Sequence, residues 1–159
     1  MDDLIKILKK KGKTKKTTLK DIREFLKKKN QKAADRMLAK RKNPLIYAVK
    51  FIHEDEISYD LTILEPGKIG DEFYETKGHT HIKKTPEVYF LLEGKGHIIA
   101  KNFRTGRKKR FALKKGKFIY VSKEYGHRTV NTGRKKLIFV TVSQVDAGHD
   151  YNVSKRKGF

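Results

Sequence analysis

The amino-acid sequence predicts an all-β protein, a jelly-roll β-sandwich or barrel with a helical N-terminal extension. Its 159 residues are enough for one domain with a short appendage. From Leu45 onward the apolar pattern changes from helical to extended, and the segments become rich in Ile, Val, Tyr, Phe and Thr. Turn signals containing glycine recur at 66–67, 93–94, 105–106, 115–116 and 132–133. Short strands separated by such turns are typical of antiparallel sheets that close around one core.

The extension is assigned to residues 1–42 and the β domain to residues 43–159. An amphipathic helix is expected over residues 1–11, and residues 13–16 are expected to form a solvated linker. The apolar run at the N-terminus is too short for a signal peptide, and no stretch approaches the length of a membrane span. A soluble intracellular protein is therefore expected.

A second helix is expected to begin near Thr18. The Thr18 hydroxyl can cap the first backbone N–H groups, with Asp21 three residues further on. The apolar stripe of this helix continues to Leu38, and Asn43-Pro44 ends it, because the residue before a proline avoids helical geometry.

The β domain is expected to contain nine strands. Each predicted segment is short, apolar or β-branched, and bounded by turn residues. The segments are 45–52, 57–65, 72–78, 87–94, 96–103, 109–115, 117–122, 127–131 and 136–145.

Charge is distributed very unevenly along the chain. The 40 lysines and arginines outnumber the 18 acidic residues, which gives a net charge of +22. Residues 1–42 have a balance of +12 and residues 95–159 a balance of +15, whereas residues 43–94 have a balance of −5. A general lysine bias would not leave the middle acidic, so the two basic parts predict a polyanionic partner.

One short segment has the spacing of a metal site. His79 and His81 lie two residues apart, so on a strand their side chains point to the same face. Glu87 opens the next predicted strand and can supply an oxygen ligand. The chain has no cysteine, which excludes disulfides, thiolate metal sites and a cysteine nucleophile.

A second segment, residues 116–131, supplies His127 as a fourth ligand. Three imidazoles and one carboxylate suit a divalent ion of the Fe, Mn, Zn or Ni class, with positions left open for substrate oxygens. The alternative interpretation is that these are unrelated histidines of the surface and the core.

The two segments resemble the paired motifs of the cupin superfamily. The first has the pattern HxH, then Glu and Gly, and in the second the spacing from Gly116 to His127 to Asn131 agrees. Ser122 and Glu124 replace the usual Pro and Gly of the second motif. The strings PGKIG, TKGHTH, EVY, HRTVN, DAGHDY and the terminal KGF are similar to the archaeal cupin-type glucose-6-phosphate isomerase family, over roughly residues 31–159.

This resemblance implies an aldose–ketose isomerase that interconverts glucose 6-phosphate and fructose 6-phosphate through an enediolate. By similarity, His79, His81, Glu87 and His127 would hold the metal, and Glu87 would act as the general base. Contacts to the sugar and phosphate would come from Tyr47, Thr62, Thr76, Gly78, Tyr89, His149 and Tyr151. The same tyrosines could instead fill a sandwich core.

The resemblance also implies the remaining properties of such an enzyme. Fe²⁺ is the expected ion, with Mn²⁺, Zn²⁺ or Ni²⁺ as alternatives, and a cytoplasmic homodimer active in glycolysis and gluconeogenesis is expected. Five residues separate His81 from Glu87, one fewer than in the isomerases of this family.

The basic residues support a rival hypothesis, an RNA- or ribosome-associated protein built on the isomerase scaffold. No RNA-recognition motif is present, so contacts with the phosphate backbone of structured RNA are expected, and no membrane partner is. The residues expected to contact RNA are Lys101, Arg104, Arg107, Lys108, Lys109, Arg110, Lys114, Lys115, Arg134, Lys135 and Lys136.

Overall fold

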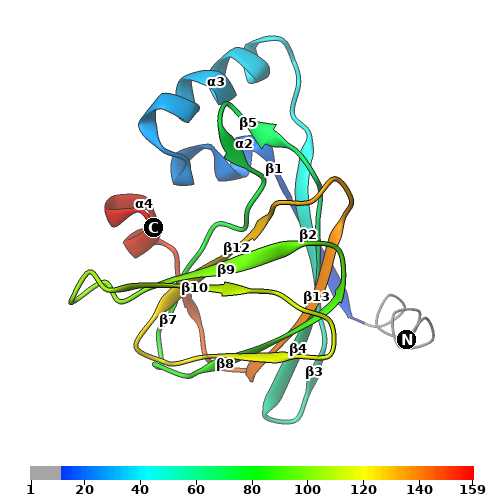
Figure 1. Ribbon diagram of the computed structural model, residues 1–159, viewed down its shortest axis with the longest axis vertical. Coiled ribbons are helices and arrows are strands. Elements are labelled where there is room, and N and C mark those ends of the chain that lie inside the picture. The colour runs from blue at the N-terminus through cyan, green and yellow to red at the C-terminus, as the bar shows by residue number, and fades with distance from the viewer. Residues whose placement is uncertain (1–11) are drawn as a thin grey trace.

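A large antiparallel sheet forms one wall of the molecule. The structure is a computed structural model that describes residues 12–159. Six strands of this sheet follow the order β1-β2-β4-β13-β8-β11, and β3 pairs with β4 at its side (Figure 1). The bounds of these strands are Lys13–Thr18 (β1), Leu45–Phe51 (β2), His53–Glu54 (β3), Ile57–Leu64 (β4), Glu87–Glu93 (β8), Phe118–Val121 (β11) and Leu137–Gln144 (β13).

A smaller sheet faces the large one and closes the barrel. Its order is β10-β9-β12, and two short antiparallel pairs, β14-β7 and β5-β6, complete the strands. The bounds are Lys68–Ile69 (β5), Glu72–Phe73 (β6), Thr80–His81 (β7), Gly96–Lys101 (β9), Lys108–Ala112 (β10), Gly126–Asn131 (β12) and His149–Asp150 (β14). The predicted jelly-roll architecture is confirmed.

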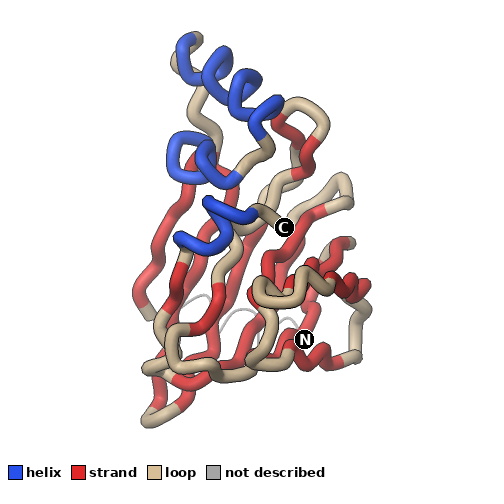
Figure 2. Tube along the Cα trace, turned by 90° about the vertical axis from the view of Figure 1, so that its left-hand side faces the viewer, coloured by secondary structure: helices blue, strands red, loops and turns tan. Residues whose placement is uncertain are grey.

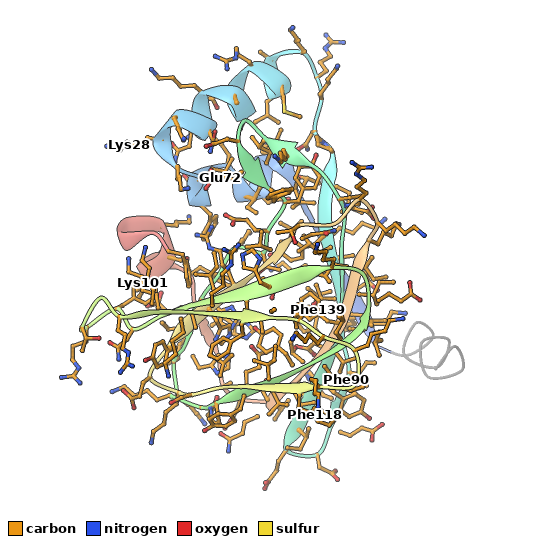
Figure 3. All side chains as sticks on the ribbon, viewed as in Figure 1. Lys28, Glu72, Phe90, Lys101, Phe118 and Phe139 are labelled. Atoms are coloured by element: carbon orange, nitrogen blue, oxygen red, sulfur yellow. The ribbon has the colours of Figure 1, made fainter. Side chains whose placement is uncertain are left out.

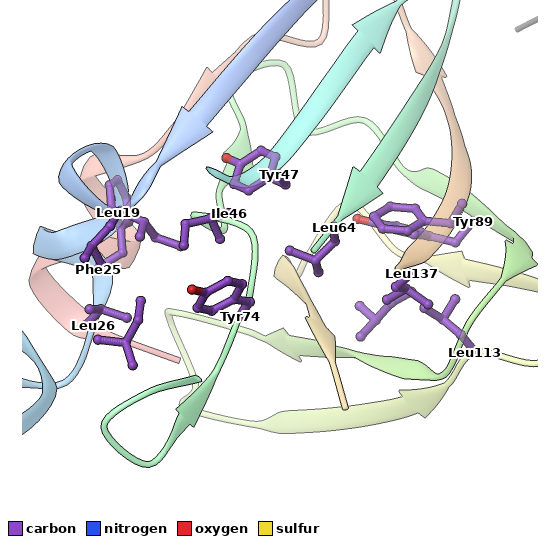
Figure 4. Close-up of a cluster of buried hydrophobic side chains, with 14 of the residues drawn as sticks. Leu19, Phe25, Leu26, Ile46, Tyr47, Leu64, Tyr74, Tyr89, Leu113 and Leu137 are labelled. Atoms are coloured by element: carbon purple, nitrogen blue, oxygen red, sulfur yellow. The ribbon is translucent and has the colours of Figure 1, made fainter. Parts of the chain in front are cut away.

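The helices gather at one end of the strands (Figure 2). They are α2 (Leu19–Ile22), the 3₁₀ helix η1 (Arg23–Phe25), α3 (Lys28–Ala39) and α4 (Asn152–Lys157). Leu19, Phe25 and Leu26 belong to the same buried cluster as Leu64 and Leu137 of the barrel (Figure 4). One hydrophobic core therefore joins the helical segment to the strands. No helix among residues 12–159 is long and apolar enough to cross a membrane.

The segment expected to be a solvated linker is a strand, so this prediction is wrong. Residues 13–18 form β1, which pairs antiparallel with β2 from Lys13↔Phe51 to Thr18↔Leu45. Only Thr17 of this strand is buried, and its lysines are exposed. Lysine-rich sequence gives little periodic signal, yet it suits an edge strand because charge discourages further pairing. The helix expected over residues 1–11 lies outside the described residues.

The second predicted helix begins where expected but is not continuous. The Asp21 carboxylate accepts hydrogen bonds from both the backbone N–H and the hydroxyl of Thr18, at 2.8 Å each. The chain then becomes extended at Leu26, and α3 starts afresh at Lys28. Leu26 is buried in the core, whereas α3 buries Asn30, whose amide donates to Asp71 and Glu72. The break lets the two parts pack on different neighbours.

Eight of the nine predicted strands are present within a few residues of their expected bounds. The exception is segment 72–78, in which only Glu72–Phe73 forms a strand, β6. Beyond it, Glu75 makes an isolated bridge to Val130, and His79 makes another to His127. Through these two bridges the segment from Glu75 to His79 runs antiparallel to β12, and it ends at His79, the first of the predicted metal ligands.

Candidate metal centre and substrate pocket

Three separate stretches of chain bring the predicted ligands together. His81 lies on β7, Glu87 is the first residue of β8, and His127 lies on β12. His79 is fixed beside His127 by two backbone hydrogen bonds, His79 N–H to His127 O at 3.1 Å and His127 N–H to His79 O at 2.9 Å. The rings of His79 and His81 stack with centroids 5.1 Å apart. The prediction that both point to one face is confirmed.

The ligand atoms of His79, His81, Glu87 and His127 converge within 4.8 Å of one another. Nε2 of His127 lies 2.7 Å from Glu87 Oε2 and 3.2 Å from His79 Nε2. Nitrogen ligands about 2.1 Å from one ion are themselves about 3.0 to 3.4 Å apart. The spacing of the two imidazole nitrogens therefore fits a shared divalent cation.

Buried polar atoms without partners give a second test of this fit. Among the described residues, the buried His81 Nε2 has no hydrogen-bond partner, and the buried Glu87 Oε2 has only the close approach to His127 Nε2 given above. Such atoms are costly unless something else satisfies them. Nδ1 of His81 lies 2.7 Å from the carbonyl oxygen of Thr85, which fixes the proton on Nδ1 and leaves the Nε2 lone pair free. The donor set fits a divalent metal ion.

The pKa shifts of His79 and Glu87 favour the protonation states that bind a cation. Burial lowers the pKa of His79 well below its ordinary value, and the neighbouring imidazoles lower it further, so the ring is neutral. Burial alone would raise the pKa of Glu87, but His127, His81 and Tyr89 lower it to about 2. A neutral imidazole and an ionised carboxylate are the forms that bind metal.

The loop between His81 and Glu87 is short, and both residues still belong to the ligand cluster. Lys84 takes a left-handed backbone conformation at φ 47°. The turn brings the Thr85 hydroxyl to 3.0 Å from His81 Nδ1, beside the Thr85 carbonyl contact. The five-residue loop therefore holds the His81 ring in place through the two Thr85 contacts to Nδ1.

A pocket adjoins the ligand cluster at His79 and Glu87, and all seven residues expected to contact sugar or phosphate line it. β2, β4 and β8 of the large sheet contribute Tyr47, Thr62 and Tyr89. Pairing of His149 with His81 places the His149 ring 4.1 Å from that of His79. The seven predicted contact residues that line the pocket are Tyr47, Thr62, Thr76, Gly78, Tyr89, His149 and Tyr151. Tyr47 and Tyr89 also belong to the hydrophobic core, as the alternative interpretation of these tyrosines expected, and their contact with substrate stays a prediction.

Sequence reasoning missed Asp60, which lines the same pocket. Asp60 is only 8% exposed, and its carboxylate accepts a hydrogen bond of 2.7 Å from the Ser58 hydroxyl. Asp60 and Thr62 are two residues apart on β4, so strand alternation could have placed them on one face. Burial raises the pKa of Asp60 from 3.8 to about 6; the Ser58 hydrogen bond opposes the shift and Glu87 adds to it.

The raised pKa of Asp60 predicts a pH-dependent effect of Asp60→Asn on stability. The folded protein holds the proton to about pH 6 and the unfolded chain to about pH 4, so stability falls between these values as pH rises. At pH 8 the variant is expected to be more stable than the parent by about 2 to 3 kcal/mol, and near pH 4 equally stable. Urea unfolding at both pH values measures this. The exposed Asp55→Asn is the control, and a pH-independent difference would contradict the prediction.

The basic residues predicted to contact RNA are only partly available. Lys101 donates to the Gly158 carbonyl, and Lys136 pairs with Glu65 at 2.9 Å. Lys109 lies over the ring of Tyr125, 4.7 Å from its centroid. The remaining residues of the predicted RNA-contact set are exposed. Those on β10 lie on an edge strand of the smaller sheet.

Comparisons with known proteins agree with this geometry. A family described as glucose-6-phosphate isomerase matches residues 14–159, so the likeness begins earlier than the expected residue 31. The isomerase of Pyrococcus horikoshii is 40% identical in an alignment of 129 positions, which covers 78% of this chain and 68% of that protein. That of Pyrococcus abyssi is 42% identical over 127 residues, 77% and 67% of the two chains.

Solved structures support the fold alone. An S161A mutant of Bacillus subtilis oxalate decarboxylase superposes with a TM-score of 0.53 at 22% identity, covering 65% of this chain and 27% of the other. An oxalate oxidase in complex with the substrate analogue glycolate has a TM-score of 0.56 at 13% identity, covering 67% and 55%. The fold is that of the cupins, and the chain belongs to the glucose-6-phosphate isomerase family.

Proposed function

We propose that the protein interconverts glucose 6-phosphate and fructose 6-phosphate. The observation that carries this proposal is the convergence of four ligand atoms within 4.8 Å beside a pocket lined by hydroxyl and imidazole groups. The relatives of this chain are named glucose-6-phosphate isomerases, which supports the choice of substrate.

The reaction moves a proton between C1 and C2 of the open-chain sugar. A divalent ion held by His79, His81, Glu87 and His127 would polarise the substrate carbonyl and stabilise negative charge on its oxygen. Glu87 is ionised at neutral pH and lies at the pocket wall, so its carboxylate can accept the proton from C2 of the aldose. The C–H electron pair forms the C1=C2 bond of the enediolate. The C2 hydroxyl proton then passes to O1, and the same carboxyl returns its proton to C1 as the C2=O bond forms, which yields the ketose.

A second group of pocket residues suits the phosphate group of the substrate. The Tyr47 and Thr76 hydroxyls and the Gly78 backbone N–H are donors, and all three residues line the pocket. Lys77 lines it too and is half-buried, with its ammonium 5.9 Å from the ring centroid of Tyr151. Burial lowers the pKa of Lys77. We assign phosphate binding to this group of residues, with Lys77 as a member that the sequence did not predict.

A coupled assay with purified protein tests the function. The apoprotein is loaded in turn with Fe²⁺, Mn²⁺, Zn²⁺ and Ni²⁺, and hexose-phosphate interconversion is followed in both directions. Turnover with at least one ion is expected, with Fe²⁺ as the expected best ion. Glu87→Gln is expected to lower kcat at least about a hundredfold. Glu93→Gln, at the exposed far end of the same strand, should leave kcat unchanged. Absence of turnover with every ion would refute the proposal.

The homodimer and the cytoplasmic location implied by the family stay predictions. Light scattering after size-exclusion chromatography measures the first, and cell fractionation the second.

A further inference from the structure

An open hollow where β9 begins and β10 ends is lined by cations and by no carboxylate. Its volume is about 470 Å³, and Lys95, Arg110 and Lys114 lie around it. The rest of the lining is Gly96, His97, Ala112, Leu113 and Thr132. We infer that this basic hollow, together with the cations next to it, binds the phosphate backbone of double-helical RNA.

The cations of the hollow form no ion pair with a carboxylate of the described residues. Lys95 and Lys114 are exposed and form no ion pair with a described residue. Arg110 instead donates to the His97 ring, with Nη2 2.9 Å from Nε2. Burial, with a smaller effect of Arg110, lowers the pKa of His97 to about 4, so the ring is neutral and accepts from the guanidinium. Repulsion among such groups lowers stability unless an anion binds there.

More cations extend the hollow in two directions. Along β10, Lys108 lies two residues before Arg110 and so points to the same face of the sheet. On the other side, the Thr132 N–H donates to the Lys95 carbonyl at 3.1 Å, which holds the following turn against the hollow. That turn carries Arg134, which is exposed. Successive phosphates of one backbone could therefore meet successive cations.

The lining indicates which kind of polyanion fits. Single-stranded nucleic acid is bound largely by stacking of its bases on aromatic side chains, and no Phe, Tyr or Trp lines the hollow. The strongly exposed aromatic residues among those described, Phe118 and Tyr120, lie on β11 of the other sheet. Proteins that read duplex DNA insert a helix or ribbon into its major groove. The wide, shallow minor groove of A-form RNA can be contacted by a sheet face through its phosphates and 2′-hydroxyls.

The RNA surface and the substrate pocket do not overlap. No residue of the hollow lines the pocket that contains Glu87. His97 and Arg110 lie on the outer face of the smaller sheet, since the register partners Ile98 and Phe111 point into the core. RNA binding can therefore be tested independently of isomerase activity.

A pair of matched variants tests the inference. The hollow variant is Lys95→Gln/Lys108→Gln/Lys114→Gln. The control is Lys28→Gln/Lys32→Gln/Lys40→Gln, which removes the same charge from exposed lysines on and next to α3, where Lys28 lies (Figure 3). Binding to a 20-base-pair RNA hairpin is followed by fluorescence anisotropy from 50 to 300 mM KCl. Thermal melting checks that both variants are folded.

The parent protein is expected to bind with an affinity that falls steeply with salt. The hollow variant should lose about tenfold or more in affinity at 100 mM KCl, and its log–log salt slope should be lower by about 2 to 3. The control should lose less than about threefold. Equal losses in both variants, equal affinity for a DNA duplex of the same length, or no binding by the parent at 50 mM KCl would each overturn the inference.

Discussion

Replacing His81 by alanine is expected to abolish metal binding and to lower kcat/KM for isomerisation at least about a thousandfold. Its Nε2 atom is buried, faces the other ligands and has no partner among the described residues. Two imidazoles and one carboxylate would remain, and the methyl group of alanine offers no lone pair. Metal content by mass spectrometry and titration calorimetry with Mn²⁺ measure the binding, and the coupled assay measures the rate.

His53→Ala is the matched control for this experiment. His53 lies on β3, is exposed, and contributes nothing to the pocket. The control should bind one metal ion per chain and retain full activity. If His81→Ala also retained one tightly bound ion, the assignment of the four ligands would be wrong even if activity were lost.

Replacing Glu75 by leucine is expected to cost about 3 to 5 kcal/mol of unfolding free energy. The Arg128 guanidinium donates to the Glu75 carboxylate, and both residues are at most 5% exposed. Arg128 Nε has no hydrogen-bond partner among residues 12–159, and the Phe159 ring lies 4.5 Å from the centre of the guanidinium. Loss of the carboxylate would leave a buried cation with too few acceptors. Urea unfolding measures the change.

A second substitution distinguishes the lost ion pair from a simple packing defect. Adding Arg128→Met to Glu75→Leu removes the uncompensated charge, so the double variant should recover most of the lost stability. Asp35→Leu breaks the solvent-exposed pair with Arg23 and should cost less than about 1 kcal/mol. A double variant less stable than Glu75→Leu would show that the charge is not the cause.

Local patterns predicted the strands and the metal site well. Short apolar segments bounded by turn residues, such as 87–94, predict strands directly, and the HxH spacing places two imidazole side chains on one face of a strand. Both signals depend on neighbours in sequence. The same reasoning would have found Asp60, had its position two residues before Thr62 on the same strand been considered.

Tertiary contacts decided the features that local patterns missed. β1 is a strand because β2 offers it an edge, and its own lysines carry no apolar period. The helix breaks at Leu26 because the core takes that side chain, which helical continuation would have directed elsewhere. The nearness of His149 to His79 depends on pairing between β14 and β7, and only the family resemblance indicated it.

The bridge between His79 and His127 has a consequence for the order of folding. These two positions are 48 residues apart, and their backbone hydrogen bonds form only when β12 has docked on the chain before β7. Contacts between such distant segments close late, because the entropy of a long loop must be lost first. A nascent chain emerging from the ribosome therefore lacks a complete ligand set until His127 has been synthesised, and capture of the ion would mark a late stage of maturation.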